Sequence, residues 1–188
     1  TVTVGQPAIT EVSAADGWQN SELLRLAAAL EQHSEHPLGE AVVSAARERD
    51  LPPAEATQFE STAGEGIEGH VEGRLVMVGS RRFMDRHDVD CERLASEAER
   101  MSAAGSTLIY VAIDQQLAGL AAVADPVKAD AASAVRTLRS RGLETVLLTG
   151  DTDRTAQAVA EQVGIPVSIA EVLPGDKADE IRRLRENG

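Results

Sequence analysis

The sequence predicts an α/β protein built from two modules of different class. In the first two-thirds, β-like runs such as "PAITEVS" (7–13) and "STLIYVAIDQQLAGLAAVAD" (106–125) alternate with pairs of helical stretches. Short turns between neighbouring strands favour an antiparallel sheet, here flanked by helix hairpins. After Asp125, single strands and single helices alternate, which is typical of a parallel α/β sheet. We therefore expect one module over residues 1–121, with 1–6 as the remnant of a hinge, and a second, truncated module over 122–188.

Periodicity assigns the elements of the first module. A helix is expected over 21–34, capped by Ser21, and Pro37 is well placed to begin a second helix. The glycine-rich stretch 56–80 reads as strands with a hairpin turn at Glu72-Gly73, and helices are expected near 80–87 and 90–104. The apolar faces of the first two helices comprise Leu23, Leu26, Ala27 and Leu30, followed by Leu38, Val42 and Ala45. The run 106–125 reads as two strands joined through Asp114 and Gln115.

The second module begins with a helix that we expect to start at Pro126, with Asp125 as its cap. Its expected apolar face comprises Val127, Ala131, Val135 and Leu138, and Gly142 closes it. A short buried strand (144–150), a helix (153–164), a strand (167–172) and a helix (174–187) are expected to follow.

Composition excludes several classes of function. The 188 residues carry a net charge of −13, which disfavours binding to nucleic-acid phosphates, and any phosphate site must therefore depend on local donors. Only 2% of the residues are aromatic, so the core must be built from Ala, Val, Leu and Ile. A single cysteine, Cys91, excludes an internal disulfide. No apolar run approaches the roughly 20 residues of a membrane helix, so we expect this piece to be soluble.

The stretch "HSEHPLGEA" (33–41) allows three interpretations. Its histidines could bind a metal, lie as polar residues at a helix junction, or contact another ligand. The possible metal ligands are scattered along the chain and include one sulfur, so we expect no structural metal site; they are His33, His36, His70, His87 and Cys91.

The stretch "AGEGIEG" matches the dinucleotide fingerprint through Gly64, Gly66 and Gly69. That fingerprint requires a helix after the glycines, whereas a second β-like run follows here. We therefore favour a glycine-rich β-turn over a Rossmann site. Glycines could also let a flat ligand lie against the backbone.

Two further stretches suit an anion. In "LLTGDTDRTA", Thr149, Gly150 and Asp151 occupy the turn after a strand, where phosphates bind in α/β sheets, although ordinary helix capping by Thr152 or Asp153 explains the pattern equally well. In "VLPGDKADEI", Lys177 lies in the first turn of a helix, where the helix dipole disfavours a cation. A nearby anion would explain this lysine, but a solvated surface lysine is the simpler interpretation.

Together these stretches resemble the cytoplasmic ATP-binding region of heavy-metal-transporting, copper-type P-type ATPases. The resemblance covers essentially the whole chain and rests on "SEHPLGEA", "GEGIEG", "VMVGS", "ADPVKADAASAVRTLRSRGLETVLLTGDTDRTAQAVAEQVGI" and "VLPGDKADEIRRLRENG". It implies a nucleotide-binding domain followed by part of a phosphorylation domain of the haloacid dehalogenase type.

The resemblance also implies roles for individual residues. ATP would be the ligand, with His36 contacting the adenine and Glu31 reaching the base. The other positions implied on the nucleotide side are Gly64, Gly66, Gly79, Ser80 (where the family usually has asparagine) and Asp125 at the hinge. Thr149, Asp151 and Lys177 would serve phosphoryl transfer, with Mg²⁺ taking part in the complete protein.

The implied partners are the rest of the same pump, namely its actuator domain and transmembrane helices, at the cytoplasmic face of the plasma membrane. The phosphorylated aspartate would lie outside this chain, so the isolated chain is expected to be inactive. Two alternatives stay open. A phosphatase of the haloacid dehalogenase type with an inserted cap would require an Asp-x-Asp nucleophile and gives no reason for the histidine signature. A non-catalytic ATP-binding module is the other.

Overall fold

The computed structural model describes residues 2–32, 34, 36–52, 54–172 and 175–187, which form two compact units. The larger unit comprises residues 5–102 and 106–126, and the smaller unit comprises residues 1–4, 103–105 and 127–188. The chain crosses between the units after Val4, Ser102, Gly105 and Pro126.

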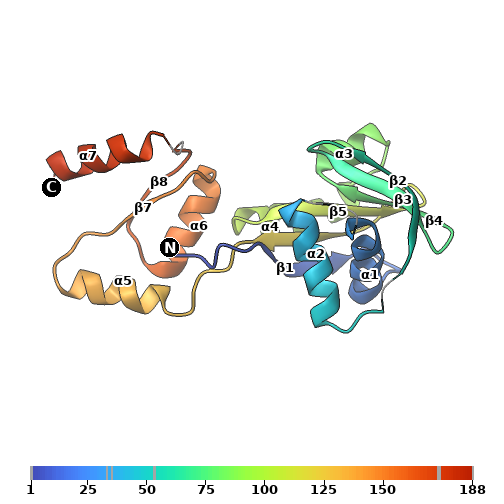
Figure 1. The fold of residues 1–188 in the computed structure, drawn as a ribbon, viewed down its shortest axis with the longest axis horizontal. Helices are drawn as coiled ribbons and strands as arrows, with labels where there is room; N and C mark the ends of the chain where they lie inside the picture. Colours follow the sequence, from blue (N-terminus) through green and yellow to red (C-terminus); the bar gives the residue numbers. More distant parts are fainter. Residues whose placement is uncertain (1, 33, 35, 53, 173–174, 188) are drawn as a thin grey trace. The chain divides into compact units, whose positions relative to one another are not determined.

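An antiparallel sheet with the strand order β1-β6-β5-β4-β3-β2 forms the centre of the larger unit (Figure 1). The strands are β1 (Ala8–Ala14), β2 (Ala56–Thr62), β3 (Gly66–Val71), β4 (Arg74–Gly79), β5 (Thr107–Ile113) and β6 (Gln116–Ala124). Both expected two-residue turns are present, and positive φ angles at Glu72, Gly73, Asp114 and Gln115 match the turn that fits a twisted hairpin. The prediction of an antiparallel sheet is therefore confirmed.

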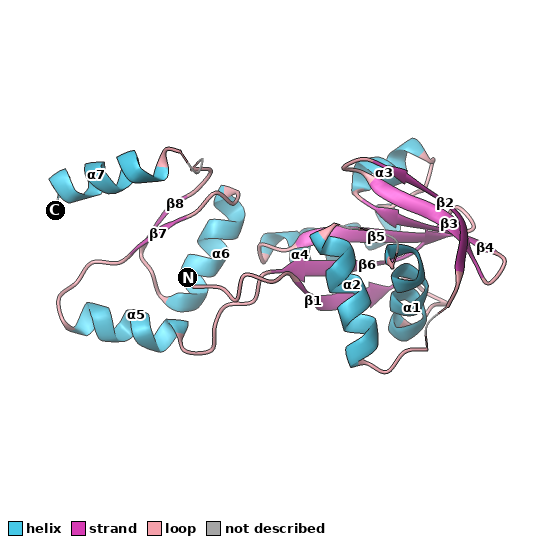
Figure 2. Cartoon of the chain, viewed as in Figure 1, coloured by secondary structure: helices cyan, strands magenta, loops and turns pink. Residues whose placement is uncertain are grey.

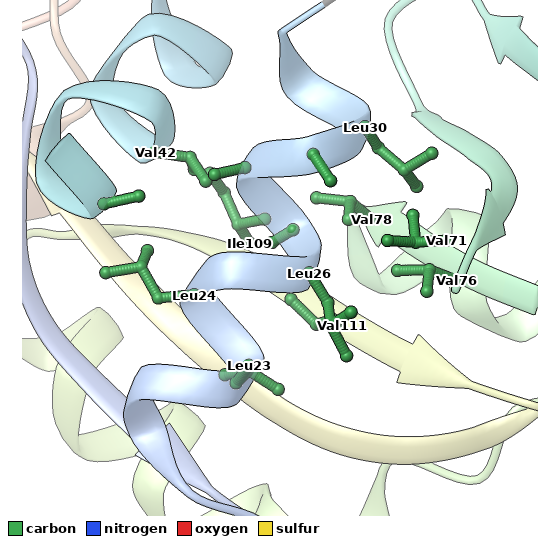
Figure 3. Packing of buried hydrophobic residues seen from close by; sticks show 14 of the residues in the cluster. Leu23, Leu24, Leu26, Leu30, Val42, Val71, Val76, Val78, Ile109 and Val111 are labelled. Carbon is green, nitrogen blue, oxygen red and sulfur yellow. The ribbon is translucent and has the colours of Figure 1, made fainter. Parts of the chain in front are cut away.

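Helices pack on both faces of this sheet because its central strands alternate apolar side chains between the two faces. Val76 and Val78 of β4 belong to the core that α1 (Asn20–Glu31) and α2 (Pro37–Glu48) also line, whereas Met77 belongs to the core on the other face. Figure 3 shows leucines of α1 lying among valines of the sheet and Ile109. The second core involves α3 (Arg81–Arg86), the 3₁₀ helix η1 (Glu92–Leu94) and α4 (Ala95–Ala103), which the secondary-structure colours of Figure 2 separate from the strands.

The starts of the first two helices differ in how well the sequence predicts them. Ser21 is not the cap of α1, because the helix begins one residue earlier, at Asn20, after Gln19. The Asn20 side chain instead accepts a hydrogen bond from the Ala14 N–H at 2.9 Å, which ties the helix start to β1. Pro37 is the first residue of α2, as predicted.

The smaller unit contains a parallel pair of strands, β7 (Val146–Leu148) and β8 (Val167–Ile169), which confirms the parallel α/β arrangement. Its helices are α5 (Ala131–Ser140), α6 (Asp153–Val163) and α7 (Lys177–Asn187). Its core is small and consists of Ala131, Val135, Ala160, Val163 and Ile165. The strand β7 is half-buried rather than buried as expected.

The helix expected from Pro126 begins only at Ala131, with Asp130 at the cap position. Before it, Val127 pairs with Thr3 in an isolated bridge, the Lys128 N–H donates to the Val2 carbonyl at 2.9 Å, and residues 129–130 form a turn. These pairings hold the backbone out of helical geometry. Leu138, expected on the buried face, is 42% exposed. Within the described part of the chain, no helix combines the length and apolar character needed to cross a bilayer.

Candidate functional site

A cavity of about 600 Å³ opens in the larger unit beside the junction of α1 and α2. Ile67, Val78 and Ile109 give it an apolar sheet surface, and Figure 3 shows Val78 and Ile109 on the face that α1 covers. The residues that line it are Glu31, Ser34, His36, Leu38, Gly39, Phe59, Ser61, Thr62, Ala63, Gly64, Glu65, Gly66, Ile67, Val78, Gly79, Ser80, Thr107, Leu108 and Ile109. The cavity thus combines apolar side chains with a few polar groups, as small-molecule sites do.

Glu31 is the last residue of α1 and is buried, with 9% of its surface exposed. Burial raises the pKa of its carboxyl group, because a charged carboxylate loses hydration there; a hydrogen bond from Ser34 and the proximity of His36 act in the opposite direction. Gly39 of α2 makes room for this side chain, since a Cβ at Gly39 would collide with Oε2 of Glu31. The cavity therefore presents a carboxylate whose hydration shell has been largely removed.

His36 is exposed and caps α2 with its ring. Its Nδ1 accepts a hydrogen bond from the Leu38 N–H at 3.2 Å, and its own backbone N–H donates to Oγ of Ser34 at 3.2 Å. A neutral ring with Nδ1 as acceptor carries its proton on Nε2, so Nε2 is a donor. The cap thus fixes both the tautomer and the ring position. His33, the other histidine of this stretch, lies outside the described residues.

The glycine-rich stretch is a β-turn, and a strand follows it. Gly64 has φ +73° in a turn closed by the hydrogen bond from the Glu65 N–H to the Thr62 carbonyl (3.0 Å), and β3 begins at Gly66. No helix starts here, so the dinucleotide fingerprint lacks the structure that it requires. The backbone of Gly64 and Gly66 borders the cavity.

Gly66 and Gly79 are partners across β3 and β4. Next to Gly79, Ser80 caps α3: its Oγ accepts a hydrogen bond from the Phe83 N–H at 3.2 Å, and its own N–H donates to the Glu65 carbonyl at 2.8 Å. Ser80 therefore has a structural role as a helix cap, although the family that the sequence resembles usually has asparagine at this position. Its hydroxyl hydrogen can still donate to a ligand in the cavity.

Asp125, expected on the nucleotide side, is not among the residues that line the cavity. Oδ1 of Asp125 accepts hydrogen bonds from the N–H groups of Gly5, at 2.8 Å, and Gln6, at 3.3 Å. Asp125 therefore joins the two segments at which the chain enters and leaves the larger unit.

Thr149, Asp151 and Lys177 belong to the smaller unit. The Thr149 hydroxyl donates to Oδ2 of Asp151 at 2.5 Å, and the Asp151 N–H donates back to Oγ1 of Thr149 at 3.2 Å. Helix capping in this turn is performed by Thr152, whose Oγ1 accepts from the Thr155 N–H. Capping therefore does not explain the Thr149–Asp151 pair. Lys177 is the first residue of α7.

Sequence reasoning missed several cavity residues, notably Ser34, Gly39, Phe59 and Thr107. A signal for Phe59 was present, because it is the single aromatic residue in the mostly polar strand "ATQFEST". In the described part of the chain, no three His, Cys, Asp or Glu side chains are grouped so that they could hold a metal ion.

Comparison with known proteins identifies the family. The family model of haloacid dehalogenase-like hydrolases matches residues 1–188, and the chain belongs to that family. More particularly, the chain is 43% identical over 188 residues to Copper-transporting ATPase 2 of Rhizobium meliloti (strain 1021), a match that covers 100% of this chain and 23% of that protein. The expected resemblance to heavy-metal P-type ATPases is thereby confirmed.

Two solved structures agree with this result. A zinc-transporting PIB-type ATPase in the E2.Pi state superposes with a TM-score of 0.91 at 34% identity, over 100% of this chain and 30% of that one. The N-domain of HMA6, a copper-transporting P-type ATPase, matches at 30% identity with a TM-score of 0.54, over 64% of this chain and 100% of that one. The chain spans about a quarter of the length of the curated relative.

Proposed function

We propose that this chain is the ATP-binding part of a copper-type, heavy-metal P-type ATPase and that the cavity of the larger unit binds the adenine of ATP. The observation that carries the proposal is the pairing of a buried acceptor, Glu31, with an oriented donor, His36, at a cavity with an apolar surface. A volume of about 600 Å³ lies in the usual range of small-molecule sites, roughly 300–1,000 Å³.

The chemistry of adenine fits these groups. The exocyclic amino group of adenine can donate a hydrogen bond to the Glu31 carboxylate, and a ring nitrogen can accept one from the Nε2–H of His36. The flat purine can cover Ile67, Val78 and Ile109. Guanine carries a carbonyl oxygen in place of the amino group and would place it against the carboxylate, so the site favours ATP over GTP.

The proposed role of the smaller unit is phosphoryl transfer. In this proposal the Thr149 hydroxyl bonds the phosphoryl oxygens, Asp151 orients that hydroxyl, and Lys177 neutralises developing charge. The larger unit presents the γ-phosphate to an aspartate in another segment of the parent protein. Mg²⁺, held with the phosphates, would supply further charge neutralisation in the complete protein.

The parent protein in this proposal is a membrane pump that couples ATP hydrolysis to export of a heavy metal, most simply copper. The resemblance to relatives that carry the name of copper transporters supports this choice of substrate. The actuator domain and transmembrane helices of the same pump are the proposed partners, and the chain would lie at the cytoplasmic face of the plasma membrane.

Calorimetric titration tests the adenine site. His36→Gln is expected to bind ATP, ADP and AMP about 5- to 150-fold more weakly than the wild type, the equivalent of losing about 1–3 kcal/mol. His33→Gln, three residues earlier in the same motif, is the matched control and should bind nearly as the wild type does. Equal ATP affinity of folded wild type and folded His36→Gln would remove His36 from the site.

A further inference from the structure

The cavity of the larger unit lacks a lysine or arginine among the described residues that line it. The ionisable residues of that lining are Glu31, His36 and Glu65, and two of these are carboxylates. A protein with a net charge of −13 repels the phosphates of a nucleotide at long range, so their binding requires cations close to the site. Glu65 itself holds two such cations.

The Glu65 carboxylate contacts two arginines of α3. Nη2 of Arg86 donates to Oε1 of Glu65 at 3.0 Å, and Nε of Arg82 lies 3.3 Å from the same oxygen. Nη1 of Arg86 lies 2.9 Å from Oε2, yet this buried oxygen accepts no hydrogen bond from any described group. The N–H groups of Nη1 are therefore directed elsewhere, and each guanidinium keeps donors that Glu65 does not use.

Arg82 and Arg86 together carry more positive charge than Glu65 neutralises. They lie four residues apart on α3, where two like charges on one helix face disfavour each other. One carboxylate compensates one of the two charges, and a second anion can compensate the other. The other described arginine ion pairs of the larger unit have at least one carboxylate for each arginine: Arg25 with Glu72, Arg74 with Asp114, Arg81 with Asp85 and Glu92, and Arg100 with Glu11.

Backbone contacts attach the start of α3 to the glycine-rich turn. The Ser80 N–H donates to the Glu65 carbonyl at 2.8 Å, and Ser80 caps the helix that carries both arginines. Glu65 and Ser80 both line the cavity. The side chains of Arg82 and Arg86 are 76% and 50% exposed, whereas that of Glu65 is 14% exposed. The carboxylate is thus an anchor within the protein, and the two guanidinium groups are accessible to a ligand.

We propose that Arg82 and Arg86, held beside the cavity by Glu65, bind the phosphate chain of the nucleotide. The inference rests on the proposed adenine site and adds to it a separate subsite for the phosphates. A guanidinium group matches two phosphate oxygens in geometry and keeps its charge at neutral pH. Glu31 and His36 bind the base, so the two arginines provide the preference for ATP over adenosine, which carries no phosphate.

Calorimetry with ATP and with adenosine, both without added Mg²⁺, tests this division. Arg82→Gln and Arg86→Gln should each bind ATP about 3- to 10-fold more weakly, and the double variant more weakly still, while each binds adenosine as the wild type does. Arg86→Lys keeps the charge but not the paired donors and should lose less than Arg86→Gln. Arg93→Gln removes the same charge from an exposed arginine of η1 and is the matched control, with both affinities within about twofold of the wild type. Thermal unfolding confirms that each variant is folded.

Salt provides an independent measurement. Added KCl screens the attraction between exposed charges, so it should weaken ATP binding to the wild type more than ATP binding to the double variant. The phosphate role is overturned if the folded double variant binds ATP as tightly as the wild type does. It is also overturned if that variant loses affinity for ATP and adenosine in the same proportion, because the arginines would then only attach α3 to the turn. A wild type that binds neither ligand would instead overturn the proposed function, and this inference with it.

Discussion

Gly66 and Gly79 face each other across β3 and β4, and the ring of Phe83 occupies the space where their Cβ atoms would lie. A Cβ would come within 2.6 Å of Cδ1 of Phe83 at Gly66 and within 2.8 Å at Gly79. At Gly79 it would also lie 2.5 Å from the Glu65 carbonyl oxygen, which is backbone and cannot move aside easily. These two glycines are therefore required by packing, whatever the cavity holds.

We expect Gly79→Ala to lower the free energy of unfolding of the larger unit by about 1–3 kcal/mol, the usual cost of overpacking. Urea unfolding followed by circular dichroism measures it. Gly175→Ala is the matched control, because a Cβ at Gly175 meets nothing within 4 Å. If Gly79→Ala were as stable as the wild type and only bound ATP more weakly, the glycine would serve the ligand rather than the fold.

Glu31 should make the stability of the protein depend on pH. Burial raises the pKa of its carboxyl group above its ordinary value, so the folded state binds its proton more readily than the unfolded state does. Above the unfolded pKa this group therefore destabilises the fold increasingly, until its folded pKa is passed. The free energy of unfolding of the wild type should accordingly fall relative to that of Glu31→Gln as the pH rises from about 4 toward 7.

Glu72 provides a control of opposite sign. Its carboxylate is paired with Arg25 at 2.7 Å, and this hydrogen bond lowers the pKa of Glu72. The stability that Glu72 contributes is thus present above its unfolded pKa and is lost as the pH falls through its folded pKa. The free energy of unfolding of the wild type should rise relative to that of Glu72→Gln as the pH rises. If Glu31→Gln and Glu72→Gln differed from the wild type by the same pH dependence, the assignment of one buried and one paired carboxylate would be wrong.

Local signals account for the parts of the fold that the sequence predicts correctly. The turns at Glu72-Gly73 and Asp114-Gln115, and the start of α2 at Pro37, depend on residues within a few positions of one another. The start of α5 depends instead on the pairing of Val127 with Thr3, more than a hundred residues away in the sequence. A proline followed by an apolar helical pattern cannot reveal that pairing.

The candidate site likewise combines residues that the sequence indicates with one that depends on strand pairing. The resemblance selected Glu31, His36, Gly64, Gly66, Gly79 and Ser80, and the structure places all of them along one cavity. Phe59 lines the same cavity and lies in a β-bulge opposite Gly69 of the neighbouring strand. The direction of a strand side chain past a bulge cannot be read from an alternating pattern, since the bulge shifts the alternation by one residue.

Ser34 should support both polar groups of the site. Its hydroxyl forms a hydrogen bond with the Glu31 carboxylate and accepts one from the His36 N–H at 3.2 Å. We expect Ser34→Ala to bind ATP about 2- to 12-fold more weakly, the equivalent of about 0.5–1.5 kcal/mol, while Ser34→Thr, which keeps the hydroxyl, retains most of the affinity. Calorimetry of both variants checks this. If Ser34→Ala and Ser34→Thr bound ATP with the same affinity, the Ser34 hydroxyl would not be needed to position Glu31 and His36.

Asp125 should affect the linker between the units and leave ATP binding unchanged. Its Oδ1 holds the N–H groups of Gly5 and Gln6, and it does not line the cavity. Asp125→Ala removes this acceptor, so we expect faster hydrogen exchange at both amides and a loss of about 1–3 kcal/mol in the free energy of unfolding. Asp125→Asn keeps a carbonyl oxygen that can accept both bonds and should lose less stability, because the charge that strengthens them is gone but the contact is not.

ATP affinity measured by calorimetry should stay within about twofold of the wild type in both variants, since a contact outside the cavity contributes little to binding. The opposite result would be a folded Asp125→Ala that binds ATP as weakly as His36→Gln and shows unchanged hydrogen exchange at Gly5 and Gln6. That result would assign Asp125 to the nucleotide site and show that its carboxylate does not hold these two amides.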